Sequence, residues 1–141
     1  MDPVTYTVTT QLPASMERVF ELLADPAKIA RWLPAARAVT ADGPLLKNAK
    51  LTIDFGARIA ECDIVEYNPP RGFGWIERGG RRNWKTMFRL EFAGGTTSLT
   101  IQQVWLPASL LSWLRVKLRP NRNVPARLNA IVQNLRTALS R

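Results

Sequence analysis

Four side chains are the candidates for acid–base chemistry in this sequence of 141 residues: Arg58, Glu66, Tyr67 and Glu77. The chain contains no histidine, which removes serine–histidine and cysteine–histidine catalysis and the usual zinc sites. Proton transfer in an enzyme built on this chain would therefore use Asp, Glu, Lys, Tyr or ordered water. We expect no metal ion and no cofactor.

The single cysteine, Cys62, allows no internal disulfide and no cysteine metal cluster. Nothing near it in the sequence would lower the pKa of its thiol, so we predict a small apolar core residue rather than a nucleophile. The sequence has no run of about 18 apolar residues, as a membrane-spanning helix would need. It also has no secretory signal at its N-terminus, and we expect a cytoplasmic protein.

The net charge of +9 is distributed unevenly along the chain. Residues 1–70 carry a net charge of −2, whereas residues 71–141 carry +11. Two interpretations stay open: a solvated basic face, or an anionic partner such as a phospholipid surface, a nucleic acid or an acidic ligand. The absence of zinc-finger spacing and of an RNP-type motif argues against nucleic acid.

Alternating apolar and β-branched residues predict seven strands, at 4–12, 36–41, 49–55, 58–67, 72–78, 82–92 and 96–105. The links between the later strands are short and rich in turn residues, for example NPPRG and AGGT. Such links favour antiparallel neighbours in a meander. Within 58–67, two alternation patterns compete, which indicates a β-bulge.

Two short helices are predicted between the first and second strands, one at 16–24 and one that begins at Pro26 and ends near Leu33. Ser15 can cap the first, and Asp25 can cap the second, with Pro26 at its first position. A basic helix follows Trp105 and ends near Pro120. Residues 123–140 carry an apolar stripe at helical spacing, which predicts a long final helix.

This order of elements predicts one α+β domain over residues 1–141. A strongly curved antiparallel sheet would wrap the long C-terminal helix. Helices as short as the first two are marginal alone and need a larger surface to lie on. We expect them to form a V-shaped cradle under the end of the long helix, which holds that helix away from the sheet and leaves a cavity.

Three stretches resemble the START-like, birch-allergen-like superfamily called SRPBCC, and in particular its polyketide cyclase/dehydrase-like branch. They are ASMERVFELLADPAKIARWLPAA, DIVEYNPPRGFGWIE and FRLEFAGGTTSLTIQQ, in this order. The resemblance covers nearly the whole chain and implies a helix-grip fold with an apolar pocket between sheet and C-terminal helix. Members include polyketide cyclases, lipid and sterol carriers, quinone-binding proteins, hormone receptors and chaperone activators, so the fold does not fix the function.

Alternate residues of a single-layer sheet face the helix, and this parity predicts the lining of the pocket. The lining would be mostly apolar with a few placed polar groups. It comprises Ile53, Phe55, Phe73, Trp75, Glu77, Trp84, Phe88, Leu99, Ile101, Gln103, Leu128 and Val132. Phe92 has the same inward parity. An inward Glu77 would need a partner. The alternatives are a packed core without a cavity and a Glu77 exposed at its strand end.

Three functions stay open at this stage. The first is a carrier or sensor of a small hydrophobic ligand, acting as a monomer or homodimer. The second, implied by the resemblance, is a polyketide cyclase or dehydrase that orients its substrate and uses one or two of the acid–base candidates.

The third is a lipid-surface or lipid-transfer protein that uses the basic helix. Arg115, Arg119 and Arg122 fall on one side of that helix. Another side carries Leu110, Leu111, Leu114 and Leu118, with Trp113 beside them. Such a helix can lie on an anionic membrane, or its leucines can cover the pocket as a lid.

Overall fold

The computed structural model describes residues 3–78, 84–106, 110–118 and 123–140; within these ranges it leaves out the side chains of Ser112, Trp113, Val116 and Lys117. The described elements, in chain order, are β1 (Val4–Leu12), α1 (Met16–Ala24), α2 (Pro26–Trp32), β2 (Ala38–Ala41), β3 (Lys50–Asp54), β4 (Ile59–Asn68), β5 (Gly72–Arg78), β6 (Trp84–Ala93), β7 (Thr96–Trp105), α3 (Leu110–Leu118) and α4 (Asn123–Leu139).

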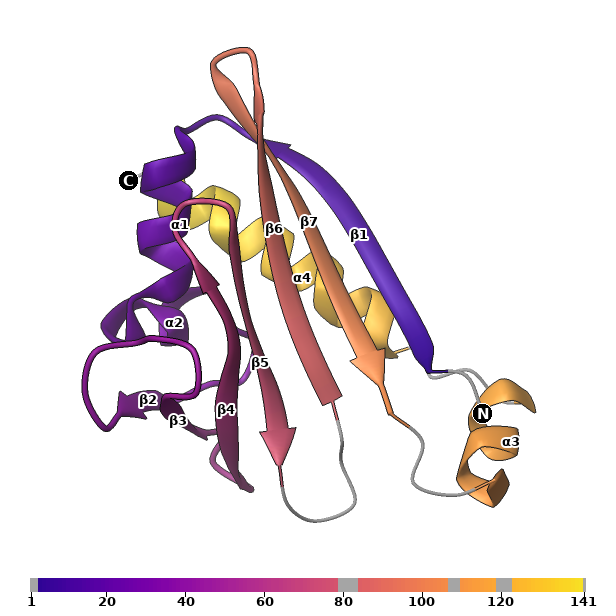
Figure 1. Cartoon of the computed structure of the whole chain (residues 1–141). Coiled ribbons are helices and arrows are strands. Elements are labelled where there is room, and N and C mark those ends of the chain that lie inside the picture. Colours follow the sequence, from indigo (N-terminus) through magenta and orange to yellow (C-terminus); the bar gives the residue numbers. More distant parts are fainter. Residues whose placement is uncertain (1–2, 79–83, 107–109, 119–122, 141) are drawn as a thin grey trace.

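The strands form one antiparallel sheet in the order β1-β7-β6-β5-β4-β3-β2. The sheet curves around α4, while α1 and α2 lie at one end of the interior (Figure 1). This confirms the predicted helix-grip fold, and each strand begins and ends within two residues of its predicted bounds. Because β7 pairs with both β1 and β6, the unpaired edges belong to β1 and β2.

The cradle under the end of α4 forms as the sequence predicts. Ser15 Oγ accepts a hydrogen bond from the Arg18 backbone N–H at 3.2 Å, and Asp25 Oδ1 accepts one from Ala27 N–H at 3.0 Å. Ser15 thus caps the start of α1, and Asp25, which follows the end of α1, caps the start of α2. Arg18 Nη2 then donates to the carbonyl oxygen of Leu139 at 2.7 Å, which ties α1 to the last turn of α4.

Trp32 occupies the centre of this end of the molecule. It is fully buried, and its Nε1–H donates to the carbonyl oxygen of Leu22 at 2.9 Å. Its ring lies edge-on against Phe88, with centroids 5.3 Å apart, and 6.4 Å from the ring of Trp75. The interior near α1 and α2 is therefore a packed aromatic core rather than a cavity.

The prediction for Phe92 is wrong, because this side chain is 75% exposed. Phe92 lies next to the β6–β7 turn, where it borders a shallow hollow with Met16 and Glu17 at the start of α1 and is not covered by them. The predicted bulge is present, since the pairing of β4 with β5 shifts between Ile64 and Glu66. Ala60, Cys62 and Ile64 are consequently buried.

We predict that Trp32→Ala destabilises the protein by about 3–5 kcal/mol, because it leaves a large cavity and removes the tie between α1 and α2. Urea denaturation followed by circular dichroism measures this change. The control is Phe92→Ala, which should change the free energy of unfolding by about 0.5 kcal/mol or less. A Trp32→Ala variant as stable as the control would show that the aromatic core does not hold the cradle.

Candidate functional site

A hollow of about 320 Å³ remains between the sheet and α4, at the strand ends opposite the β6–β7 hairpin. We call it the sheet–helix pocket. It brings together six of the residues that parity predicts, namely Ile53, Phe55, Trp75, Glu77, Trp84 and Gln103. Arg58, Thr86 and, from α4, Arg127 complete its polar lining. The side of the pocket towards α2 is formed by Leu33, Pro34 and Ala35.

The other predicted residues belong to the packed core and do not line this pocket. They are Phe73, Phe88, Leu99, Ile101, Leu128 and Val132, and none is more than 6% exposed. Parity assigned them to the correct face of the sheet or helix. It could not give their depth, because Trp32 enters from α2 and fills the space in front of Phe88.

Glu77 has the partner that its burial requires. Arg58 Nη1 donates to Glu77 Oε1, and the Glu77 side chain is only 14% exposed, compared with 34% for Arg58. The Arg58 guanidinium also lies 4.6 Å from the centroid of the Phe55 ring, in a cation–π contact. The Arg58–Glu77 ion pair therefore lies at one side of the pocket, and Glu77 is not a solvated strand-end residue.

Gln103 is the second buried polar group of the pocket, with 7% of the residue exposed. Its Nε2 donates to Thr86 Oγ1 at 3.3 Å, whereas its Oε1 finds no hydrogen-bond partner among the described residues. Rotating the amide would let Thr86 donate to the oxygen instead, but it would leave the nitrogen unpaired. In either orientation, one polar end of Gln103 lacks a partner.

The remaining acid–base candidates lie elsewhere. Tyr67 contacts Phe20 of α1, with ring centroids 5.6 Å apart. Glu66 comes directly after the bulge and points to the outer face of the sheet, where its Oε2 is 3.7 Å from Arg89 Nη2. Of the four candidates, only Arg58 and Glu77 meet in the sheet–helix pocket.

Cys62 is buried and pairs with Glu77 across β4 and β5. Burial, followed by the negative charge of Glu77, raises the pKa of the Cys62 thiol from 9.0 to about 12. The thiol is consequently protonated near neutral pH, and Cys62 is the core residue that the sequence predicts. The described residues contain no group of three or more His, Cys, Asp or Glu that could hold a metal ion.

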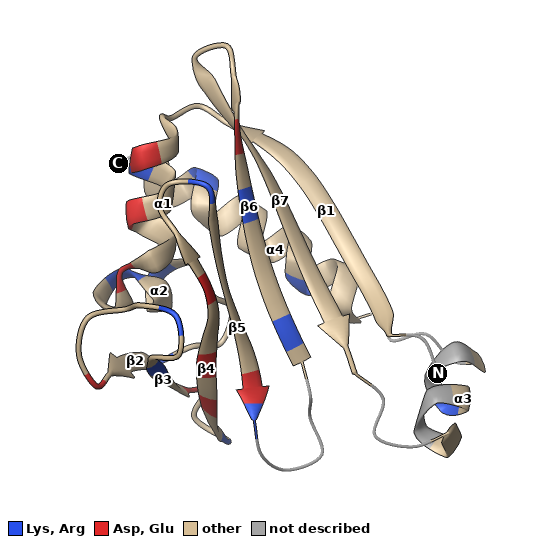
Figure 2. Ribbon diagram, viewed as in Figure 1, with Lys and Arg blue, Asp and Glu red and all other residues tan. Residues whose placement is uncertain are grey.

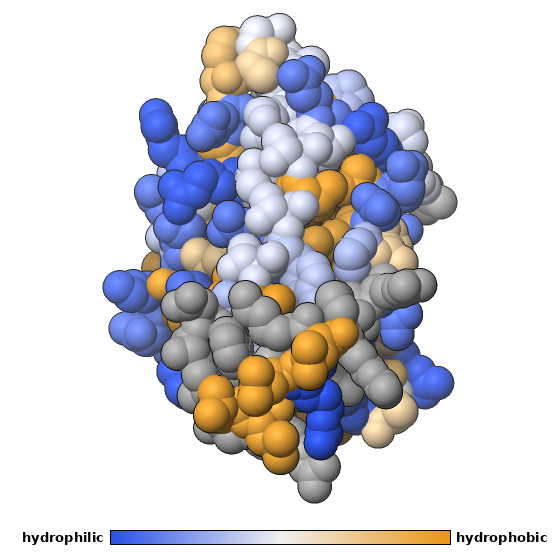
Figure 3. All heavy atoms as spheres, turned by 90° about the vertical axis from the view of Figure 1, so that its right-hand side faces the viewer, coloured by the Kyte–Doolittle hydropathy of each residue, from blue (hydrophilic) through white to orange (hydrophobic). Residues whose placement is uncertain are grey.

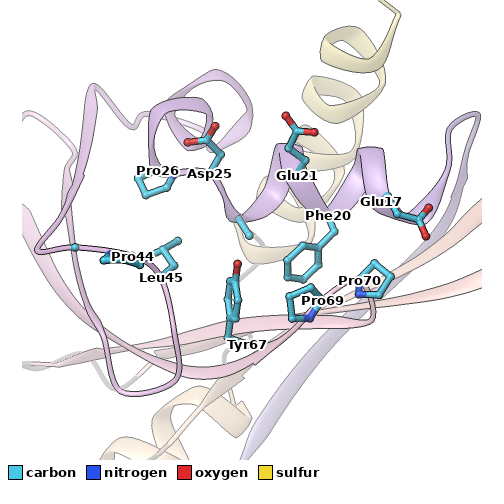
Figure 4. Close-up of a pocket in the computed structure, with 12 residues that line it drawn as sticks. Glu17, Phe20, Glu21, Asp25, Pro26, Pro44, Leu45, Tyr67, Pro69 and Pro70 are labelled. Atoms are coloured by element: carbon cyan, nitrogen blue, oxygen red, sulfur yellow. The ribbon is translucent and has the colours of Figure 1, made fainter.

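A second and larger hollow, of about 580 Å³, lies outside the sheet–helix interface. Figure 4 shows it between α1, the segment before β3 that contains Pro44 and Leu45, and the β4–β5 turn at Pro69 and Pro70. We call it the α1 groove. Sequence reasoning missed it because three segments far apart in the chain form it, and none carries a recognisable motif.

Comparison with known proteins gives a family and a fold. Residues 3–139 match the family described as polyketide cyclase/dehydrase and lipid transport. A comparison with curated proteins finds no match. No helix in the described part of the chain is long and apolar enough to span a membrane.

Among solved structures, the chain is similar to the Aha1 dimer from Colwellia psychrerythraea, with 13% identity, a TM-score of 0.72 and 96% of each chain covered. CalU16 from Micromonospora echinospora gives 17% identity and a TM-score of 0.65, covering 98% of this chain and 80% of that chain. Ara h 8.0201 gives 13% identity and a TM-score of 0.66, covering 99% of this chain and 100% of that chain. At these identities, the similarity shows a shared fold alone.

We predict that Cys62 lowers stability at alkaline pH. Its unfolded thiol loses a proton above pH 9.0 while the folded thiol keeps it up to about pH 12, so between these values the unfolded state is stabilised relative to the folded state. At pH 10 the loss should be about 1.4 kcal/mol, and by about pH 8 it should be less than about 0.1 kcal/mol. The measurement is the difference in unfolding free energy between the wild type and Cys62→Ala. A difference that does not change with pH would contradict the raised pKa.

Proposed function

The chain belongs to the polyketide cyclase/dehydrase and lipid transport family, and from this premise we propose that it is a carrier or sensor of a small aromatic ligand. The ligand would occupy the sheet–helix pocket. Its apolar body would lie against Trp75, Trp84 and Phe55, and one hydroxyl group would reach Gln103.

The observation that carries this proposal is the unpaired end of Gln103 in a pocket with aromatic walls. A buried polar atom without a partner is costly, and a ligand that supplies one removes this cost on binding. A hydroxyl group both donates and accepts, so it satisfies Gln103 in either orientation of the amide. A purely apolar ligand would leave the amide unpaired.

The volume of the pocket limits the size of the ligand. About 320 Å³ is at the lower end of the range of about 300–1,000 Å³ for small-molecule sites. It suits a ligand of two or three fused rings better than a full sterol. Affinity would come mainly from burial of apolar surface, about 25 cal/mol per Å² before the costs of ordering.

We predict that 2-naphthol binds about fivefold more tightly than 2-methylnaphthalene, which has a similar shape but cannot form a hydrogen bond. Equilibrium dialysis measures both affinities. Gln103→Met should abolish the preference for naphthol while leaving the binding of methylnaphthalene nearly unchanged. Trp84→Ala should weaken both probes, because it removes a wall of the pocket that they share.

Two results would overturn this proposal. One is equal binding of the two probes to the wild type, and the other is a naphthol preference that survives in Gln103→Met. Native mass spectrometry of the purified protein, followed by solvent extraction, would identify any ligand retained from the cell. A retained molecule without a hydroxyl or a similar polar group would also contradict the role of Gln103.

A cyclase or dehydrase is the alternative function for the same pocket. It is favoured by the family description and by the Arg58–Glu77 pair beside the aromatic walls. Arg58 could hold a developing enolate, and Glu77 could accept a proton only after its bond to Arg58 loosens. A rate for a confirmed activity that does not depend on pH would argue against this role.

The exposed leucines of α3 favour a second use of the protein, at a lipid surface. Leu110, Leu111, Leu114 and Leu118 are 58%, 69%, 42% and 80% exposed, beside the exposed Arg115. Hydrophobic side chains gather over α3 on the face shown in Figure 3. With this exposure, the leucines do not act as a lid in the described structure. Arg119, Arg122 and the side chain of Trp113 lie outside the described residues.

We predict that the protein floats with vesicles that contain 30% phosphatidylglycerol and not with vesicles of phosphatidylcholine alone, because the leucines insert while the basic half meets anionic lipid. The double variant Leu111→Ser/Leu118→Ser should lose this binding. Leu46→Ser, at a leucine of the β2–β3 loop that is 59% exposed, should retain it. Binding that is indifferent to lipid charge and to 0.5 M salt would exclude this use.

A further inference from the structure

The α1 groove has an apolar floor. Phe20 and Leu45 are buried beneath it, at 6% and 7% exposure, and Tyr67 forms one wall. The ring of Tyr67 meets that of Phe20 edge-on, at 68° between their planes. Figure 4 shows the two rings side by side, with Pro69 and Pro70 beyond them. These rigid side chains lose little conformational entropy when they are covered.

The rim of the groove is acidic, although the protein as a whole carries a net charge of +9. Glu17, Glu21 and Asp25 line it from α1 and the junction between α1 and α2. Lys28 is their cationic neighbour, with its Nζ 2.8 Å from Glu21 and 3.9 Å from Asp25. The three carboxylates therefore outnumber this lysine along one side of the groove, where Figure 4 shows those of Glu21 and Asp25 pointing away from the floor. Figure 2 shows the acidic residues on α1.

We propose that the α1 groove binds a small hydrophobic organic cation, an amine or ammonium with an aromatic body. The body would cover the floor formed by Phe20, Leu45 and Tyr67, and the cationic group would lie at the α1 edge of the groove, near Glu17 and Glu21. This site is distinct from the sheet–helix pocket, and its occupant does not depend on the ligand of that pocket.

The aromatic floor and the acidic rim would both favour the binding of such a ligand. The faces of aromatic rings attract cations, and nearby carboxylates add a Coulombic attraction that a neutral ligand does not gain. The hydrogen bond from Lys28 lowers the pKa of Glu21, so this carboxyl group is ionised at neutral pH. An anionic ligand would be repelled by the same rim. The groove volume of about 580 Å³ lies within the range of small-molecule sites.

The test uses three probes with one aromatic body and different charges: 2-(2-naphthyl)ethylamine, 2-(2-naphthyl)ethanol and 2-naphthylacetate. Nuclear magnetic resonance locates each probe through shifts of Tyr67 and Leu45 for the groove and of the Trp84 indole for the pocket. The amine should shift the groove signals with an affinity about fivefold higher than the alcohol, and the acetate should not shift them.

The variant Glu17→Gln/Glu21→Gln should reduce the affinity of the groove for the amine about fivefold. It should leave the alcohol unchanged, because the floor is intact. The matched control is Glu61→Gln/Glu91→Gln, which removes the same charge from exposed glutamates of β4 and β6 outside the groove and should leave amine binding unchanged. Trp84→Ala should weaken binding in the sheet–helix pocket and leave the groove signals as in the wild type.

The proposal is overturned if the amine and alcohol bind the groove equally, or if both double variants weaken the amine alike. It is also overturned if the amine shifts only the Trp84 signal. Groove signals that shift with protein concentration alone, and no longer do so in Leu111→Ser, would show that α3 of a second copy fills the groove instead. Loss of naphthol binding in the pocket would not affect any of these readouts, so the two proposals fail separately.

Discussion

The arrangement of the interior depends on the contacts of one residue, Trp32, through both its indole ring and its backbone carbonyl group. Its N–H fixes α2 to Leu22 of α1, its ring packs against Phe88 and Trp75 of the sheet, and its carbonyl oxygen accepts a hydrogen bond from Asn134 of α4 at 3.1 Å. One residue thus joins both short helices, the sheet and the long helix. A buried aromatic residue with a satisfied N–H can do this because it combines a large apolar surface with one directed bond.

The position of Trp32 also decides where a ligand can bind. It fills the interior next to α1 and α2, so the space that remains lies at the opposite strand ends, where Glu77, Trp84 and Gln103 are found. The bulge in β4 also determines which charged side chains reach the pocket. It turns Glu66 outward and leaves Arg58 and Glu77 as the charged pair at the pocket. The chemistry available there is consequently narrow.

The fold could be predicted from the sequence because its determinants are local. Alternation, caps at Ser15 and Asp25, and short turns define the elements, and an antiparallel meander then leaves few arrangements. Only half of the residues predicted to line the pocket do so, because parity gives the face of the sheet on which a residue lies but not its depth in the core. Phe73 and Phe88 are covered by Phe20 and Trp32 of the short helices. Phe92, by contrast, stays exposed beside the start of α1. The α1 groove needs contacts between distant segments, which no local pattern contains.

The groove and the pocket share a wall of aromatic rings. Phe20 at the floor of the groove lies 6.3 Å from Phe73, and Phe73 lies 5.7 Å from Trp75, which lines the sheet–helix pocket. Close-packed rings transmit displacements, because none can move far without moving its neighbour. The two hollows differ in charge: carboxylates line one side of the groove, whereas the pocket contains a neutral amide, the Arg58–Glu77 ion pair and Arg127. The two hollows therefore present different chemistry on the two sides of one aromatic partition.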